Sequence, residues 1–187
     1  MPIFGRWRAD RDLQRKADGY VERLLAEPED DDVRWLAHVA TRGDSDHARW
    51  ELRYAKRALG LLTAERDALD DRTGSLVARA LAAALARDPN VAAEMQEISE
   101  RQFNARLSAY RDGLAARLGP ATAARMGQTL FAFAGGSFRQ VDDNILHGGE
   151  LLGRYLTEAN AALRETFGKA SLPENLPPSA VAGKHGA

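Results

Sequence analysis

The pattern of apolar residues is clearest in the carboxyl-terminal third of the chain, between residues 138 and 167. Apolar side chains recur there at steps of three, four and seven, and Gly149 falls on the same line: Phe138, Val141, Ile145, Leu152, Leu156, Ala159, Leu163 and Phe167. This spacing puts them on one face of an α-helix. We predict one helix of about thirty residues, roughly 45 Å long, against which the other segments pack. Ser137 and Gln140 have the spacing of a capping box, which would start this helix.

Six further helices are predicted before this one, each ended by a glycine, a proline or a capping residue. Their approximate bounds are 9–27, 29–43, 45–70, 76–87, 89–118 and 121–134. We expect Thr73-Gly74-Ser75 to form a turn and cap, and Pro89 to occupy the first position of a helix. In the helix over 89–118 the step from Ile98 to Phe103 is five residues, so the buried face rotates midway along the helix. This predicts a change of packing partner or a bend.

No stretch alternates apolar and polar residues as a strand would. The chain is therefore predicted to be all-α: one single-domain bundle of about seven helices, three of them long, over residues 9–168. Residues 1–8 carry Ile3, Phe4 and Trp7 and are predicted to be a docking segment that packs on the core or on a partner. Residues 169–187, rich in proline and glycine, are predicted to be a flexible tail.

Composition excludes several classes of function. The 187 residues include no cysteine, so disulfides, thiolate catalysis and cysteine-ligated zinc are excluded. The net charge of −1 gives no electrostatic reason to expect nucleic acid as a partner. No apolar run reaches the eighteen or so residues of a membrane span, and the first residues lack the apolar run of a secretory signal. We expect a cytoplasmic protein without a membrane span.

Three histidines within the predicted bundle are candidate ligands or bases: His38, His47 and His147. His47 with Glu51, and Asp143 with His147, are each four residues apart and so share a helical face. Such pairs can contribute to a metal site, but two ligands do not complete one. We interpret them as ionic pairs on helices, and predict no metal, no cofactor and no catalytic residue.

The helix over 138–167 has two unusual features. Asp142 falls at the border of the apolar stripe, where a partly buried carboxylate would need a partner such as arginine. Gly148, Gly149 and Gly153 occupy interior positions of this helix, where each glycine lowers helix stability by about 1 kcal/mol relative to alanine. Our interpretation is that another backbone approaches closely at the Gly149-x-x-x-Gly153 notch, within the chain or across a dimer. The alternatives are a kink or room for a ligand.

Two hypotheses of function follow. The first is a non-catalytic interaction or assembly protein, acting as a homodimer or as a subunit of a larger complex. Trp50 and Tyr54 widen an apolar arc beside Arg53, and only four of the 26 basic residues are lysines; aromatic residues and arginine are enriched at interfaces. Gly149 and Gly153 complete the interface candidates.

The second hypothesis is a small-molecule-binding or enzymatic bundle. Its apolar pocket would lie near Gly148 and Gly149. The polar groups would come from Asp142 and a histidine of the His38–His47 region. The full set of ligand-binding candidates is His38, His47, Glu51, Asp142, His147, Gly148 and Gly149.

Overall fold

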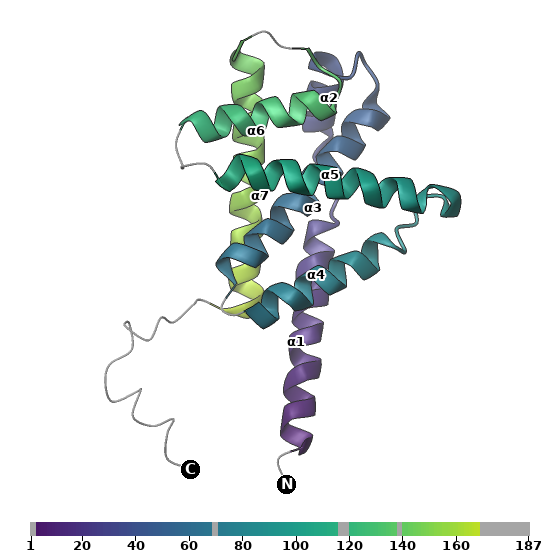
Figure 1. Cartoon of the computed structure of the whole chain (residues 1–187), viewed down its shortest axis with the longest axis vertical. Helices are drawn as coiled ribbons and strands as arrows, with labels where there is room; N and C mark the ends of the chain where they lie inside the picture. Colours follow the sequence, from purple (N-terminus) through teal and green to yellow (C-terminus); the bar gives the residue numbers. More distant parts are fainter. Residues whose placement is uncertain (1–2, 69–70, 116–119, 138–139, 169–187) are drawn as a thin grey trace.

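The computed structural model describes residues 3–68, 71–115, 120–137 and 140–168, and these residues contain helices and no strand. The all-α prediction is confirmed (Figure 1). The elements are α1 (Ile3–Leu24), α2 (Asp30–Val39), α3 (Ser45–Asp67), α4 (Asp71–Leu85), a 3-10 turn η1 (Ala93–Met95), α5 (Gln96–Ala115), α6 (Pro120–Phe133) and α7 (Asp143–Phe167). None of these helices combines the length and the apolar character needed to cross a membrane.

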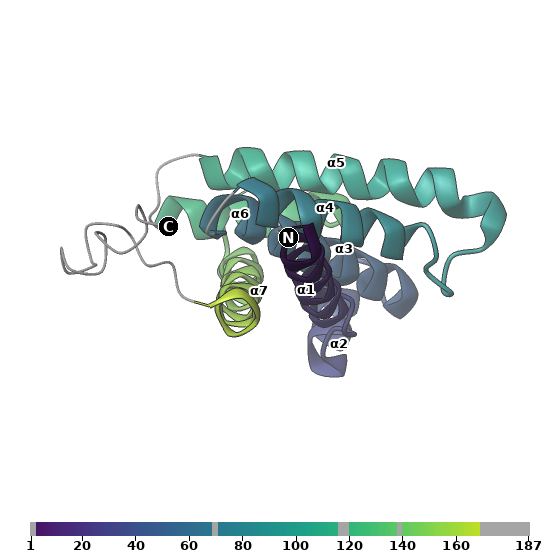
Figure 2. The same cartoon turned by 90° about the horizontal axis from the view of Figure 1, so that it is seen from below.

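The helices form three layers around α3 (Figure 2). One outer layer is α5, the middle contains α3, α4 and α6, and the other outer layer contains α1, α2 and α7. Helix α3 packs on α2, α4, α5 and α7, and its buried residues include Leu52, Tyr54, Leu59 and Leu61. Because these residues point in several directions around the axis, the wide apolar arc is covered by several neighbours.

Helix α7 packs chiefly on α6, α3 and α1. Its buried residues include Ile145, Leu152 and Leu163, so this part of the apolar stripe is confirmed. The predicted start of the helix is wrong. Asp142 is the N-cap, and its carboxylate accepts a hydrogen bond of 2.9 Å from the backbone N–H of Ile145. The Ser137–Gln140 capping box therefore does not start the helix, because the Asp142 side chain satisfies a backbone donor of the first turn.

Glycines set the contact between α6 and α7. A Cβ added to Gly149 would lie 2.2 Å from the carbonyl oxygen of Ala123, and one added to Gly127 would lie 1.9 Å from that of Ile145. The predicted close approach of a backbone at Gly149 is thus confirmed, and its partner is α6. Gly153 has open space where a side chain would be, so its place in the predicted notch is wrong.

Helices α4 and α5 differ from the prediction at their starts. Helix α4 begins at Asp71, so Thr73 and Gly74 lie inside it and not in a turn. Both are buried, and Gly74 packs near the backbone at the end of α3, which offsets the low helix propensity of glycine. Pro89 does not start a helix, because the Asp88 carboxylate accepts a hydrogen bond from the backbone N–H of Asn90 and fixes a turn.

Helix α1 begins at Ile3, within the predicted docking segment of residues 1–8. Residues 169–187, predicted as a tail, lie outside the described residues. Helices α1, α3, α5 and α7 have 22, 23, 20 and 25 residues, and each is longer than the remaining three described helices.

Candidate functional site

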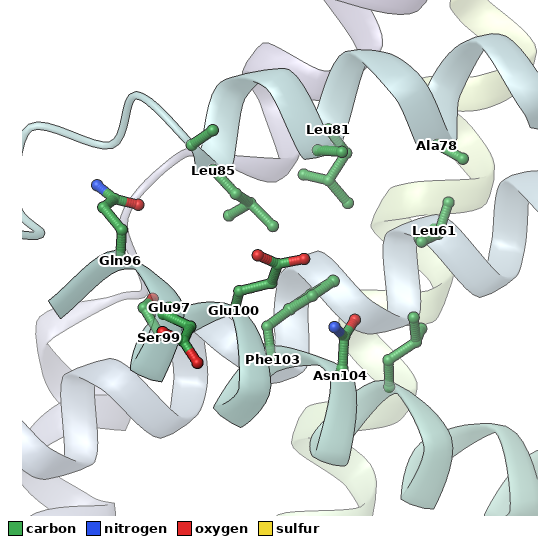
Figure 3. A pocket seen from close by; sticks show the side chains of 13 residues that line it. Leu61, Ala78, Leu81, Leu85, Gln96, Glu97, Ser99, Glu100, Phe103 and Asn104 are labelled. Atoms are coloured by element: carbon green, nitrogen blue, oxygen red, sulfur yellow. The ribbon is translucent and has the colours of Figure 1, made fainter. Parts of the chain in front are cut away.

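An apolar groove lies between α4 and α5 (Figure 3). Its volume is about 480 Å³, within the roughly 300–1,000 Å³ of typical ligand pockets. This apolar groove is lined by Leu61, Ala78, Leu81, Ala82, Leu85, Ala86, Gln96, Glu97, Ser99, Glu100, Phe103, Asn104 and Leu107. Leu61 of α3 forms the floor, and the other residues belong to the two walls and to the end of α4.

The sequence of α4 explains the shape of this groove. Ala78, Ala82 and Ala86 recur every four residues on one side of the helix, so this wall has short side chains. Leu81 and Leu85 lie between them and give the wall its apolar character. The opposite wall contributes Phe103 and Leu107 from α5. The two helices diverge from their connection (Figure 1) and rest on α3, which leaves the groove between them.

The connection between the walls is held on α3 by a buried ion pair. Arg57 Nη2 lies 2.9 Å from Asp88 Oδ2, and the two side chains are only 4% and 5% exposed. Burial raises the pKa of Asp88, but the Asn90 N–H and the Arg57 guanidinium more than offset this and hold the pKa below its ordinary value. Burial lowers the pKa of Arg57, against the opposing effect of Asp88.

A second hollow of about 440 Å³, the polar pocket, lies where the start of α3 meets α5. Arg106 Nε donates to Glu51 Oε2 at 2.9 Å, and Glu51 is 2% exposed. The Arg106 guanidinium also lies over the rings of Tyr54 and Phe133, 5.1 and 4.4 Å from their centroids. The Tyr54 hydroxyl donates to Gln102 Oε1 at 3.0 Å. These contacts join α5 to α3.

Four predicted site residues come together in the polar pocket: His47, Trp50, Glu51 and Tyr54. His47 Nε2 lies 3.4 Å from Glu51 Oε1, which is the predicted helical pair. No third His, Asp or Glu joins them in a metal-binding group among the residues the structure describes. Of the four, Glu51 and Tyr54 link α3 to α5, through Arg106 and Gln102.

Trp50 and Arg53, the other interface candidates of α3, are engaged within the chain. The Arg53 guanidinium lies 4.6 Å from the centre of the Trp50 ring. The same guanidinium donates to both carboxylate oxygens of Glu27, at 3.0 and 2.8 Å. The Trp50 ring also lies 5.6 Å from the Tyr54 ring. This part of the predicted interface is thus already occupied by intramolecular contacts.

The remaining candidates lie elsewhere. His38 and His147 are exposed, and His147 packs its ring 4.5 Å from that of Trp35. Asp142 is exposed and caps α7, so the expected burial of its carboxylate is wrong. The space beside Gly148 is filled, because a Cβ there would contact Gly127, Phe131 and Trp35. His38, Asp142 and His147 do not line either hollow.

Sequence reasoning missed the residues that form the apolar groove. Leu81, Leu85, Phe103 and Leu107 have the spacing of ordinary core residues. One signal was the alanine at every fourth position along one face of α4, because such a stripe gives a helix face with only short side chains. A second signal was the five-residue step between Ile98 and Phe103, which does not fit a single helical stripe. Ile98 is 37% exposed and Phe103 is 6% exposed, so only the later stripe of α5 is buried.

The chain matches no protein-family model, and no curated protein or solved structure matches it significantly. In the polar pocket Glu51 and Arg106 neutralise each other, and burial, together with the Glu51 charge, raises the pKa of the neighbouring Tyr110 so that its hydroxyl stays protonated. The apolar groove offers apolar contact and two carboxylates. This arrangement suits binding.

Proposed function

We propose that the protein is a non-catalytic helical interaction protein, acting as a homodimer or as a subunit of a larger complex, and that the apolar groove is its binding surface. The observation that carries the proposal is the groove of about 480 Å³ between two helices, with apolar residues on its floor and both walls. A side chain such as Leu or Phe gains roughly 1.5–3 kcal/mol when it is fully buried. Covering this groove is therefore favourable.

The partner element that best fits the groove is an amphipathic helix. From Ala78 to Ala86 the wall formed by α4 and its end is about 12 Å long at 1.5 Å per residue, close to two helical turns. The alanines of this wall allow a partner backbone to approach, while Leu81, Leu85 and Phe103 provide apolar contacts. Recognition of this kind places an apolar helix face in a groove between helices.

The polar pocket supports a binding role over a catalytic one. Its two most buried charges, Glu51 and Arg106, are paired with each other, so neither is free to act on a substrate as acid, base or anion site. Tyr54 is also engaged, through Gln102 and Ser99. We assign this cluster to the attachment of α5, and therefore of one groove wall, to α3.

Site-specific photo-cross-linking of the full chain in the cells of its natural source tests the proposal. A photoreactive amino acid at Ala82, on the groove wall, should form a covalent adduct of defined mass. The same amino acid at Ala161, an exposed residue of α7, is the matched control and should form none. Leu85→Glu should abolish the adduct at Ala82 without loss of helical circular dichroism. Equal labelling at both positions, or no adduct at Ala82, would overturn the proposal.

A further inference from the structure

The apolar groove carries charge on only one of its walls. Glu97 and Glu100, from the first turns of α5, are its charged lining residues, and both are acidic and exposed. Neither makes a hydrogen bond or an ion pair with a described residue, whereas Glu51 on the other side of α5 is paired with Arg106. Figure 3 shows the Glu100 side chain extending across the groove toward α4. This wall therefore offers unpaired negative charge to an occupant.

The opposite wall is short and uncharged. It consists of Ala78, Leu81, Ala82, Leu85 and Ala86. Arg79 and Arg87 are not among the lining residues, and Arg87 Nε donates instead to the carbonyl oxygen of Ala83 at 3.0 Å. A helix that fills the groove thus meets short apolar side chains on one flank and carboxylates on the other. Its complement is an apolar face with lysine or arginine along one flank only, the flank next to α5.

The described surface of this chain does not present such a face. Its exposed large apolar side chains are those of Met95, Ile98, Val141 and Leu146. Glu94 and Glu97 adjoin the first two in sequence, Asp142 adjoins Val141, and Asp143 lies about one helical turn before Leu146. A second copy that docked through these residues would bring carboxylates toward the carboxylates of the groove, and like charges disfavour such a contact.

We infer that the apolar groove binds a helix of a different protein, one whose apolar face is bordered by lysine or arginine on the flank that meets α5. The inference rests on the proposed function and names the chemistry of the partner. Apolar side chains of that helix pack against Leu81, Leu85 and Phe103, and its cations lie near Glu97 and Glu100. Because both carboxylates are exposed, they act chiefly on the choice of partner and on the rate of association.

Two synthetic peptides test the sign of the charge. Each has about 14 residues, long enough for a helix, with leucines at helical steps of three and four; the other positions are lysine in one peptide and glutamate in the other. Fluorescence anisotropy measures the binding of each labelled peptide to the purified full chain. At low salt the Leu/Lys peptide should bind about tenfold more tightly, and its advantage should shrink as the salt concentration rises. Equal affinities, or tighter binding of the Leu/Glu peptide, would overturn the inference.

Charge reversal locates the attraction at the groove. The double variant Glu97→Arg/Glu100→Arg should reverse the preference, so that the Leu/Glu peptide binds more tightly. Asp112→Arg is the matched control and should keep the preference for the Leu/Lys peptide, because Asp112 is an exposed acid of the same helix about 18 Å beyond Glu100. A double variant that still prefers the Leu/Lys peptide would contradict the inference.

Leu85→Glu separates docking in the groove from simple charge attraction. The substitution adds a negative charge, so attraction alone predicts tighter binding of the Leu/Lys peptide. Docking predicts weaker binding, because a charged side chain replaces part of the apolar wall. Tighter binding with unchanged helical circular dichroism would sink the inference.

The cross-link at Ala82 separates this inference from the proposed function. An adduct with the mass of two copies, twice 20.5 kDa, would show that the occupant is this chain; the inference would then be wrong, and the groove would remain a binding surface. A preference for the Leu/Glu peptide together with an adduct to another protein would have the same consequence. Absence of both the adduct and peptide binding would overturn both.

Discussion

Helices α6 and α7 touch backbone to backbone, whereas α4 and α5, which also follow each other in the chain, leave a groove between them. Both pairs use small residues. At the α6–α7 crossing Gly127 and Gly149 oppose each other, so each removes the side chain that would hold the other helix away. In α4 the small residues are alanines, and the opposite wall presents Phe103 and Leu107.

The difference shows that small residues close a contact only when the facing helix is free to approach. Helix α5 is fixed on α3 by the Arg106–Glu51 pair and by the hydrogen bond from Tyr54 to Gln102. The connection from α4 is fixed on α3 by the Arg57–Asp88 pair. The groove walls are thus held by α3, and the space between them stays open.

The largest effect is expected where the groove connection is anchored. Arg57→Met should destabilise the protein by about 3–5 kcal/mol, because Asp88 would remain as a buried carboxylate without its cation. Urea denaturation at neutral pH measures this loss. A change below about 1 kcal/mol, the range of surface ion pairs, would show that the pair does not anchor the connection.

The same variant should respond differently to acid. The pKa of Asp88 lies below its ordinary value of 3.8, so its stabilising contribution is present above that pH and is lost as the pH falls through the lower folded-state pKa. In Arg57→Met one lowering influence is absent, while burial still raises the pKa. The stability difference between wild type and variant should therefore be largest near neutral pH and should narrow below about pH 4. A stability difference that stays constant as the pH falls below about 4 would contradict the assignment.

The next largest effect tests the closed contact. Gly149→Ala should cost about 3 kcal/mol, the upper part of the range for overpacking, because the added Cβ would lie 2.2 Å from a backbone oxygen that cannot rotate away. Gly153→Ala, four residues later in the same helix, is the matched control. Its Cβ meets open space, so it should be neutral or stabilising by up to about 1 kcal/mol. Similar melting temperatures for the two variants would contradict the close contact.

A smaller effect concerns the attachment of α5. Tyr54→Phe removes the hydroxyl that bonds Gln102 and Ser99 but keeps the ring beside Arg106. We expect a loss of about 1 kcal/mol, the usual net value of one hydrogen bond, in thermal unfolding followed by circular dichroism. Tyr54→Leu, which also removes the ring, should cost more. If the two variants unfold alike, the hydroxyl carries most of the attachment.

The smallest effect is expected within the groove. Ala82→Leu adds bulk to an exposed position of the wall and should change the free energy of unfolding by less than about 0.5 kcal/mol. The same substitution should impair binding, because it fills the space that a partner helix would use. Differential scanning calorimetry measures the first effect, and cross-linking from a photoreactive amino acid at Ala78, also on the groove wall, measures the second. A strong destabilisation would mean that the groove is part of the closed core.

The sequence alone determined the helical class and most of the helices, because these depend on residues close together in the chain. Apolar steps of three and four located α2, α3, α6 and most of α7. The sequence offered Asp44 or Ser45 as the cap of α3, and in the structure the cap is Asp44, whose side chain accepts a hydrogen bond from the backbone N–H of His47. The pairing of His47 with Glu51 also followed from their spacing. Such interactions reach only one helical turn.

Tertiary structure decided what covers each apolar face. Gly74 is helical because it packs near the end of α3, and Gly149 meets α6 because Gly127 lies opposite, two relations that no local pattern contains. Leu85 and Leu163 have the same chemistry, yet one lines an open groove and the other lies in the core. Burial depends on where a neighbouring helix is held, and for the groove that position is set by Arg57, Tyr54 and Arg106, through contacts with residues 31 to 55 positions away in the chain.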